Sequence, residues 1–187
     1  MESDIIRNLP DRLRLARGGK GWTLEQFAQA SGVSRAMISK IERGEVSPTA
    51  SVLARLAAGL GVSMASLFPP PATGGAQLSR WQDQSDWRDP ASGYVRRNIS
   101  PEGSAAEIVY VTFPSGARVM FDNHKASRSI EQQVWVLEGV IEMTIGEAVT
   151  LLGTGDCLRM RLDQPITFHN PGEEAARYAV ILSRHHS

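Results

Sequence analysis

The stretch TLEQFAQASGVSRAMISKIER, from Thr23 to Arg43, decides the fold of the N-terminal part of the chain. It predicts two short helices joined by a tight turn. Thr23, followed three residues later by Gln26, forms a capping box that starts the first helix. Gly32 provides the positive φ that a sharp turn requires, and Ser34 caps the second helix. Apolar residues recur at helical spacing, so each helix has one face suited to burial.

The second helix separates an inward face from an outward one. Val33 and Ile38 occupy the positions of a hydrophobic staple around the cap, and Ile41 continues the inward face. A helix with basic, hydroxyl and small side chains on its other face can lie in a major groove and meet base edges. That outward face consists of Arg35, Ala36, Ser39, Lys40 and Arg43. The alternative is a helical hairpin whose charged face is only solvated.

This stretch resembles the helix-turn-helix of phage-repressor-type (Cro/C1, XRE-like) DNA-binding domains, and the resemblance runs from about Leu9 to Phe68. The matching features are Gln26, Ala28, Gly32-Val33-Ser34, Ile38-Ser39 and Ile41-Glu42-Arg43-Gly44. The resemblance implies a five-helix bundle that binds a double-stranded DNA operator. It also implies that Arg35 and Lys40 contact base edges, with Ser34, Ala36 and Ser39 beside them. The implied phosphate contacts come from Gln26 and Arg43.

The remaining helices of this part follow from apolar spacing and caps. A first helix is expected over residues 4–17, with Pro10 shifting its start to Asn8 or Leu9. Ser47 and Pro48 are expected to start a fourth helix that Gly61 ends. A short fifth helix is expected from Ser63 through Leu67.

Composition supports a protein of two different parts. The 187 residues have a formal net charge of zero, but residues 1–68 hold nine Lys/Arg against six Asp/Glu, whereas residues 69–187 hold eleven against fourteen. The N-terminal part is therefore basic, as a DNA-binding domain should be. Cys157 is the single cysteine, which excludes an internal disulfide and fits the cytoplasm. We expect no membrane segment, because no apolar run is long enough to span a bilayer.

A run of three prolines and two glycines within residues 69–76 predicts a linker between a DNA-binding domain at 1–68 and a second domain at 77–187. The second domain contains many short β-rich runs separated by turn residues, which predicts an all-β sandwich or barrel. The fold class is therefore α+β with two domains.

The second domain is similar to a cupin, a double-stranded β-helix barrel, over roughly residues 106–182. The run from Val134 to Gly139 matches the end of the first cupin motif, and Gly155-Asp156 with residues 168–172 matches the second. The resemblance implies an interior cavity and, in most cupins, a metal held by three His and one Glu. Position by position, those ligands fall on Gln132, on Ile166, and on either Ala126 and Arg128 or Lys125 and Ser127. None of these suits a transition metal, so we expect neither metal nor cofactor.

The same positions predict a pocket for a small molecule. Strand alternation places Gln132 and Val134 on one interior face, and Ile166 and Phe168 on another. An arginine directed inward would favour an anionic group. The expected effector-binding residues are Arg96, Arg128, Gln132, Val134, Ile166 and Phe168.

Together these features predict a cytoplasmic, homodimeric transcriptional regulator that is not an enzyme and has no catalytic residues. Its metal-free cupin domain would dimerise and sense a small, anionic metabolite. The alternative is a metal-dependent cupin enzyme of the oxygenase or epoxidase type with an appended helical domain. A third possibility is a cupin that only dimerises.

Overall fold

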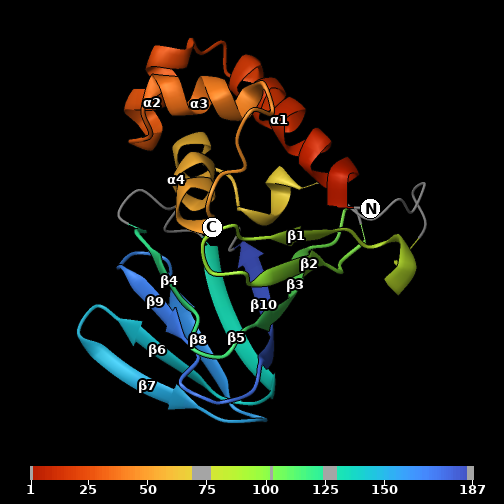
Figure 1. Cartoon of the computed structure of the whole chain (residues 1–187), viewed down its shortest axis with the longest axis vertical. Helices are drawn as coiled ribbons and strands as arrows, with labels where there is room; N and C mark the ends of the chain where they lie inside the picture. Colours follow the sequence, from red (N-terminus) through yellow and green to blue (C-terminus); the bar gives the residue numbers. More distant parts are fainter. Residues whose placement is uncertain (1, 69–76, 102, 124–129, 185–187) are drawn as a thin grey trace.

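A computed structural model describes residues 2–68, 77–101, 103–123 and 130–184. A group of helices packs on one end of a β-barrel (Figure 1). The helices are α1 (Glu2–Gly19), α2 (Leu24–Ser31), α3 (Arg35–Glu42), α4 (Ala50–Leu60) and the short 3-10 helix η1 (Ala65–Leu67). The expected linker at 69–76 lies outside the described residues. Within the described ranges, no helix has both the length and the apolar character that crossing a membrane requires.

Three expectations about the helices were wrong in detail. Helix α1 begins at Glu2 and passes through Pro10, which removes only one N–H donor from the helix. Helix α4 is capped by Thr49, whose hydroxyl accepts from the Val52 amide at 3.4 Å, rather than by Ser47 and Pro48. The fifth helix is a single 3-10 turn, so the bundle contains four α-helices and η1 within residues 2–68.

The barrel is built from ten strands in the described part of the chain, as expected for a cupin. A short 3-10 helix, η2 (Trp81–Asp83), precedes them. The strands are β1 (Asp86–Arg88), β2 (Val95–Asn98), β3 (Ala106–Phe113), β4 (Arg118–Phe121), β5 (Ile130–Glu138), β6 (Ile141–Ile145), β7 (Ala148–Leu152), β8 (Cys157–Arg161), β9 (Ile166–His169) and β10 (Ala176–Arg184). Nine of them fall on the β-rich runs of the sequence. The sequence did not predict β1, because three residues are too few to show alternation.

The strands form two antiparallel sheets that face each other. One has the order β1-β2-β3-β10-β5-β8, and the other has the order β4-β9-β6-β7. Alternate residues of each strand point into the barrel, as Val109, Val111 and Phe113 do on β3. The buried side chains of the barrel and of the helices belong to one continuous hydrophobic cluster.

Strand alternation also explains why two side chains of types that often pack in cores are exposed. Trp135 lies between the buried Val134 and Val136, so it points outward and is 47% exposed. Cys157 pairs with Trp135 across β5 and β8 and is exposed as well. Trp81, which lies on η2 and not on a strand, is 58% exposed.

The helical domain is joined to the barrel by specific contacts. Asp89 is 2% exposed and accepts a hydrogen bond from the backbone amide of Ala50, the first residue of α4, at 3.0 Å. Asn98 on β2 donates to the carbonyl of Ala65 at 2.9 Å. The ring of Phe68 lies 5.7 Å from that of Trp87. These contacts fix α4 over one end of the barrel (Figure 1).

Candidate nucleic-acid interface and effector cavity

The turn between α2 and α3 is formed by the residues that predicted it. The amide of Gln26 donates to the Thr23 hydroxyl at 3.2 Å, and the Gln26 side-chain oxygen accepts from the Thr23 amide at 2.8 Å, which completes the capping box. Gly32 ends α2 with a φ of 71°. The Ser31 hydroxyl donates to the Phe27 carbonyl and accepts from the Val33 amide. These two buried hydrogen bonds stabilise the turn.

Helix α3 presents the expected outward face. Ser34 caps it by accepting from the Met37 amide at 3.3 Å, while Ile38 and Ile41 are buried. The exposed residues are Ser34, Arg35, Ala36, Met37, Lys40 and, just after the helix, Arg43, while Ser39 is half-buried. Met37, 39% exposed, was not among the residues expected on this face.

Two of the residues that were expected to contact phosphates also make contacts within the protein. Gln26 belongs to the capping box. Arg43 donates to both carboxylate oxygens of Glu45, at 2.5 and 2.9 Å, and to the Ser39 hydroxyl. The hydrogen bond with Arg43 lowers the pKa of the Glu45 carboxyl and raises that of the guanidinium. Arg43 is therefore already oriented along the side of α3.

A buried ion pair fixes α3 against α1. Arg17 donates to both carboxylate oxygens of Glu42, at 2.7 and 2.8 Å, and to the Trp22 carbonyl at 2.7 Å. The hydrogen bond to Glu42 raises the pKa of Arg17, against the effect of burial. Bidentate pairs of this kind define geometry as well as charge, so the outward face of α3 is held in one orientation.

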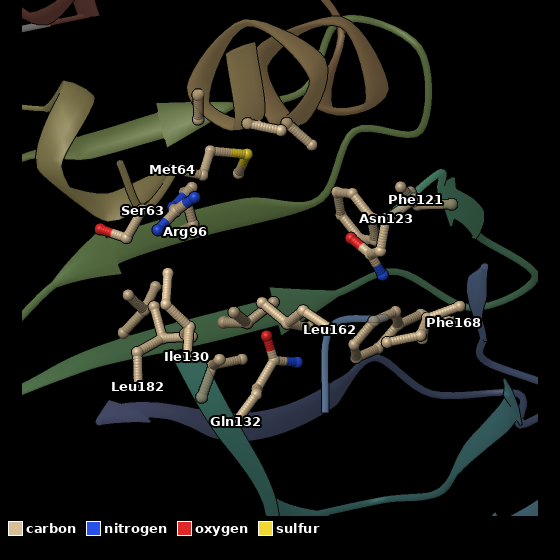
Figure 2. A pocket seen from close by; sticks show the side chains of 18 of the residues that line it. Ser63, Met64, Arg96, Phe121, Asn123, Ile130, Gln132, Leu162, Phe168 and Leu182 are labelled. Atoms are coloured by element: carbon tan, nitrogen blue, oxygen red, sulfur yellow. The ribbon is translucent and has the colours of Figure 1, made fainter. Parts of the chain in front are cut away.

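A cavity of about 130 Å³ lies between α4 and the interior of the barrel (Figure 2). This volume far exceeds the roughly 10–15 Å³ that one water needs by the same measure. Four of the six expected effector-binding residues line it, namely Arg96, Gln132, Ile166 and Phe168. Most of the other lining side chains are apolar; they include Val109, Val111, Val119, Phe121, Leu162, Val180 and Leu182.

The other two expected residues do not line the cavity in the described structure. Val134 is fully buried on the same face of β5 as Gln132, but it is not among the residues that line the cavity. That expectation was wrong, because alternation gives the side of a strand but not the depth at which a cavity ends. Arg128 lies outside the described residues.

Arg96 is the charged group among the described residues that line the cavity, and it is only 6% exposed. Its guanidinium carbon lies 4.9 Å from the centre of the Phe68 ring. Its Nε–H is buried and has no hydrogen-bond partner among the described residues. Burial lowers the pKa of Arg96, and the nearby Tyr94, Glu107 and Tyr178 partly offset this effect.

Two buried tyrosines stand beside this guanidinium. Burial raises the pKa of Tyr94 to about 12, with the charge of Arg96 acting in the opposite direction. Burial likewise raises the pKa of Tyr178 well above its usual value. Both phenols are therefore neutral at physiological pH and do not neutralise Arg96.

The residues at the cupin metal positions do not fit a transition metal. Gln132 and Ile166 face the cavity where two of the ligands would be. His169 lies on the other side of β9 from Ile166 and Phe168, and its Nδ1 is 3.1 Å from a Glu142 carboxylate oxygen. Glu131 accepts from Arg159 at 3.0 Å. In the ranges that the structure describes, no three His, Cys, Asp or Glu side chains form a group that could hold a metal.

Comparisons with known proteins agree with this architecture. The helix-turn-helix family profile matches residues 13–67, and the cupin-domain profile matches residues 109–182. The uncharacterised HTH-type transcriptional regulator YazB of Bacillus subtilis (strain 168) is 41% identical over 59 residues, which cover 32% of this chain and 86% of YazB. The chain belongs to the HTH-type transcriptional regulators.

The likeness of this regulator to its relatives extends over both domains. The HTH-type transcriptional regulator SutR of Escherichia coli (strain K12) is 24% identical over 179 residues, which cover 96% of each chain. A crystal structure of an HTH_3 family transcriptional regulator from Vibrio cholerae superposes over the whole of both chains with a TM-score of 0.80 and 25% identity. Hydroxypropylphosphonic acid epoxidase from S. wedmorenis gives a TM-score of 0.48 at 19% identity over 95% of this chain and 97% of its own. That score is too low to support a functional argument.

Proposed function

We propose that this regulator reads its operator with the outward face of α3 and that a small anionic molecule in the cavity controls it. Arg35 and Lys40 would meet base edges, with Ser34, Ala36 and Ser39 beside them. Gln26 and Arg43 would contact phosphates. The observation that carries the DNA assignment is the exposure of Arg35, Ala36 and Lys40 on one face of a helix fixed by its cap and by the Arg17–Glu42 pair.

The proposed effector site rests on the cavity and Arg96. An apolar wall with a few polar anchors is typical of small-molecule sites. A buried, incompletely paired guanidinium is costly unless an anion meets it. Arg96 and Gln132 would provide the polar contacts, and Ile166 and Phe168 the apolar ones.

We further propose that the regulator is not an enzyme and acts in the cytoplasm, where its operator DNA is found. The absence of a suitable ligand at Gln132 and Ile166 supports this over a metal-dependent oxygenase or epoxidase.

A homodimer completes the proposal. One repressor-type domain reads only a half-site, so two copies should bind a two-fold operator with half-sites about one helical turn apart. The barrel is proposed to form the contact between the copies.

The test is selection of bound sequences from a random duplex library with the purified full chain, followed by titration of the selected operator at several salt concentrations. We expect a pseudo-palindromic site, bound much more tightly than a scrambled duplex, with affinity that falls as salt rises. Equal affinity for both duplexes would contradict sequence-specific reading.

A further inference from the structure

Helix α4 belongs to the DNA-binding domain, yet it forms part of the cavity. Ala54, Ala57 and Ala58 line the cavity, and the chain after the helix adds Val62, Ser63 and Met64. Figure 2 shows Ser63 and Met64 beside Arg96. The remaining lining residues come from the barrel. A ligand in the cavity would therefore touch both domains. The small alanine side chains leave the space that it would occupy.

Another side of α4 packs directly on the helix-turn-helix. Gly59 lies so close to α2 that a Cβ added there would be 2.9 Å from backbone and Cβ atoms of Ser31. Arg55 donates to the carbonyl of Gly32, the residue that forms the turn, at 3.3 Å. One helix of 11 residues thus contacts the cavity on one side and the turn before α3 on another.

The polar end of the cavity lies at the same domain boundary. Arg96 lines the cavity from β2, and the ring that packs on its guanidinium is Phe68 of the helical domain. Ser63, also in the cavity lining, donates to the Glu107 carboxylate on β3. The planar fork of an arginine matches a carboxylate, which can accept the unpaired Nε–H.

We infer that the cavity is a two-domain site for a small carboxylate with a compact apolar body, in which Arg96 binds the carboxylate and α4 covers the apolar part. Occupancy then changes operator affinity through α4, because the bound molecule contacts the helix that supports the turn before α3. This requires two arrangements of α4, one that favours operator binding and one that does not. The bound molecule changes operator affinity only as far as its own affinity differs between these two arrangements. This inference rests on the proposed function, since it assigns the ligand class and the coupling element of the same regulator.

The first experiment uses thermal unfolding of the full chain with a panel of small aliphatic and aromatic monocarboxylates, including isovalerate and benzoate, each with its matched primary amide. A ligand that binds only the native state raises Tm. We expect at least one carboxylate to raise Tm more than its amide, and Arg96→Gln to weaken its binding about 10- to 100-fold, the equivalent of a charge-assisted hydrogen bond. Equal shifts from acids and amides, or no shift from any acid, would overturn the carboxylate assignment.

The second experiment tests α4 with Ala58→Leu, which fills the cavity from the DNA-binding domain. Ser51→Leu is the matched control, because Ser51 is exposed on the same helix and does not line the cavity. We expect Ala58→Leu to weaken binding of the active carboxylate at least tenfold. Without ligand, the variant's operator affinity should differ from that of the wild type in the same direction as the carboxylate changes the operator affinity of the wild type. Ser51→Leu should change neither quantity.

The outcomes separate this inference from the proposed function. If the wild type does not prefer its selected operator over a scrambled duplex, the proposed function itself fails. If it binds the operator and the carboxylate but Ala58→Leu behaves as Ser51→Leu does, the two-domain site is wrong. Where Arg96→Gln does not fold, Arg96→Lys, which keeps the charge but not the fork, should still bind the carboxylate more weakly than the wild type.

Discussion

At the scale of single residues, Arg35 and Lys40 determine how well α3 can read DNA. Both are exposed on the outward face of α3. Replacing either with alanine should cost about 1–3 kcal/mol of binding to the selected operator and should flatten the preference for that sequence, because a base contact is lost. Fluorescence anisotropy with operator and scrambled duplexes measures both effects. Arg118→Ala is the control, because Arg118 is exposed on β4 and lies on the sheet opposite the proposed contact between copies. Wild-type binding by both α3 variants would disprove the assignment.

The buried Tyr94 predicts a loss of stability at high pH. An unfolded tyrosine ionises near pH 10, whereas folded Tyr94 keeps its proton up to about pH 12. Between these values the folded state binds more protons, so its stability is complete below pH 10 and falls as pH rises. A pKa difference of two units corresponds to a loss of about 2–3 kcal/mol in the free energy of unfolding.

Tyr94→Phe removes this ionisation. Its free energy of unfolding, measured by denaturant titration between pH 10 and 12, should fall less steeply than that of the wild type. The remaining slope should include Tyr178, whose pKa burial also raises, so the double variant should be flatter still. A Tyr94→Phe slope equal to the wild-type slope would contradict the prediction.

At the scale of elements, the close packing of α4 on α2 depends on Gly59. A glycine inside a helix normally costs roughly 0.5–1 kcal/mol relative to alanine, so Gly→Ala should stabilise. At Gly59 the added Cβ would meet Ser31 atoms at 2.9 Å, two of them backbone. We therefore expect Gly59→Ala to destabilise the protein by about 1–3 kcal/mol, as overpacking does.

Gly18 in α1 provides the matched control. A Cβ added to Gly18 meets nothing within 4 Å. Gly18→Ala should leave the free energy of unfolding unchanged or raise it slightly. If Gly59→Ala is as stable as Gly18→Ala, α4 is not held against the turn as the structure indicates.

Elements with local signals were predictable from the sequence. Thr23 and Gln26, Gly32 and Ser34 each act on the backbone within a few residues, and all were identified with their roles. The start of α4 was missed because Ser47 and Thr49 are both good caps. The contact that helps fix the start at Ala50, the hydrogen bond from its amide to Asp89, is made 39 residues away.

The cavity was predictable only in part, because its extent also depends on contacts between residues that are distant in the sequence. Alternation correctly directed Gln132, Ile166 and Phe168 inward, and it left open which way Arg96 points. It wrongly extended the cavity to Val134, since its depth depends on packing from both sheets. Ala54 and Ala58 carried no signal at all, because they line the cavity only after one domain has packed on the other.

At the scale of the whole molecule, the non-ligand residues Gln132 and Ile166 at two cupin metal positions predict how the protein responds to chelators. A structural metal contributes folding free energy, so removing it would lower stability. We expect purified protein to contain no stoichiometric iron, manganese or zinc, and excess chelator to leave Tm unchanged. Elemental analysis and thermal unfolding measure this. About one equivalent of metal would instead favour the enzyme alternative.

We propose that two copies meet through the outward face of the six-stranded sheet. Tyr110, Ala179, Trp135 and Cys157 lie side by side across β3, β10, β5 and β8. The ring of Trp81 extends the row, 5.6 Å from that of Tyr110. The ion pair Arg159–Glu131 and the pair of Arg177 with Glu138 lie nearby. An aromatic centre with a charged rim is typical of protein interfaces.

Sedimentation of the full chain at micromolar concentration tests this face. The wild type should be a dimer, and Trp135→Glu should be a monomer, because a charge at the centre of an apolar interface is desolvated without a partner. Leu151→Glu is the matched control, since Leu151 on β7 is 62% exposed but lies on the other sheet. The monomeric variant should also lose most of its operator affinity, because one domain reads only a half-site. If Leu151→Glu dissociates the dimer and Trp135→Glu does not, the copies meet through the β4-β9-β6-β7 sheet instead.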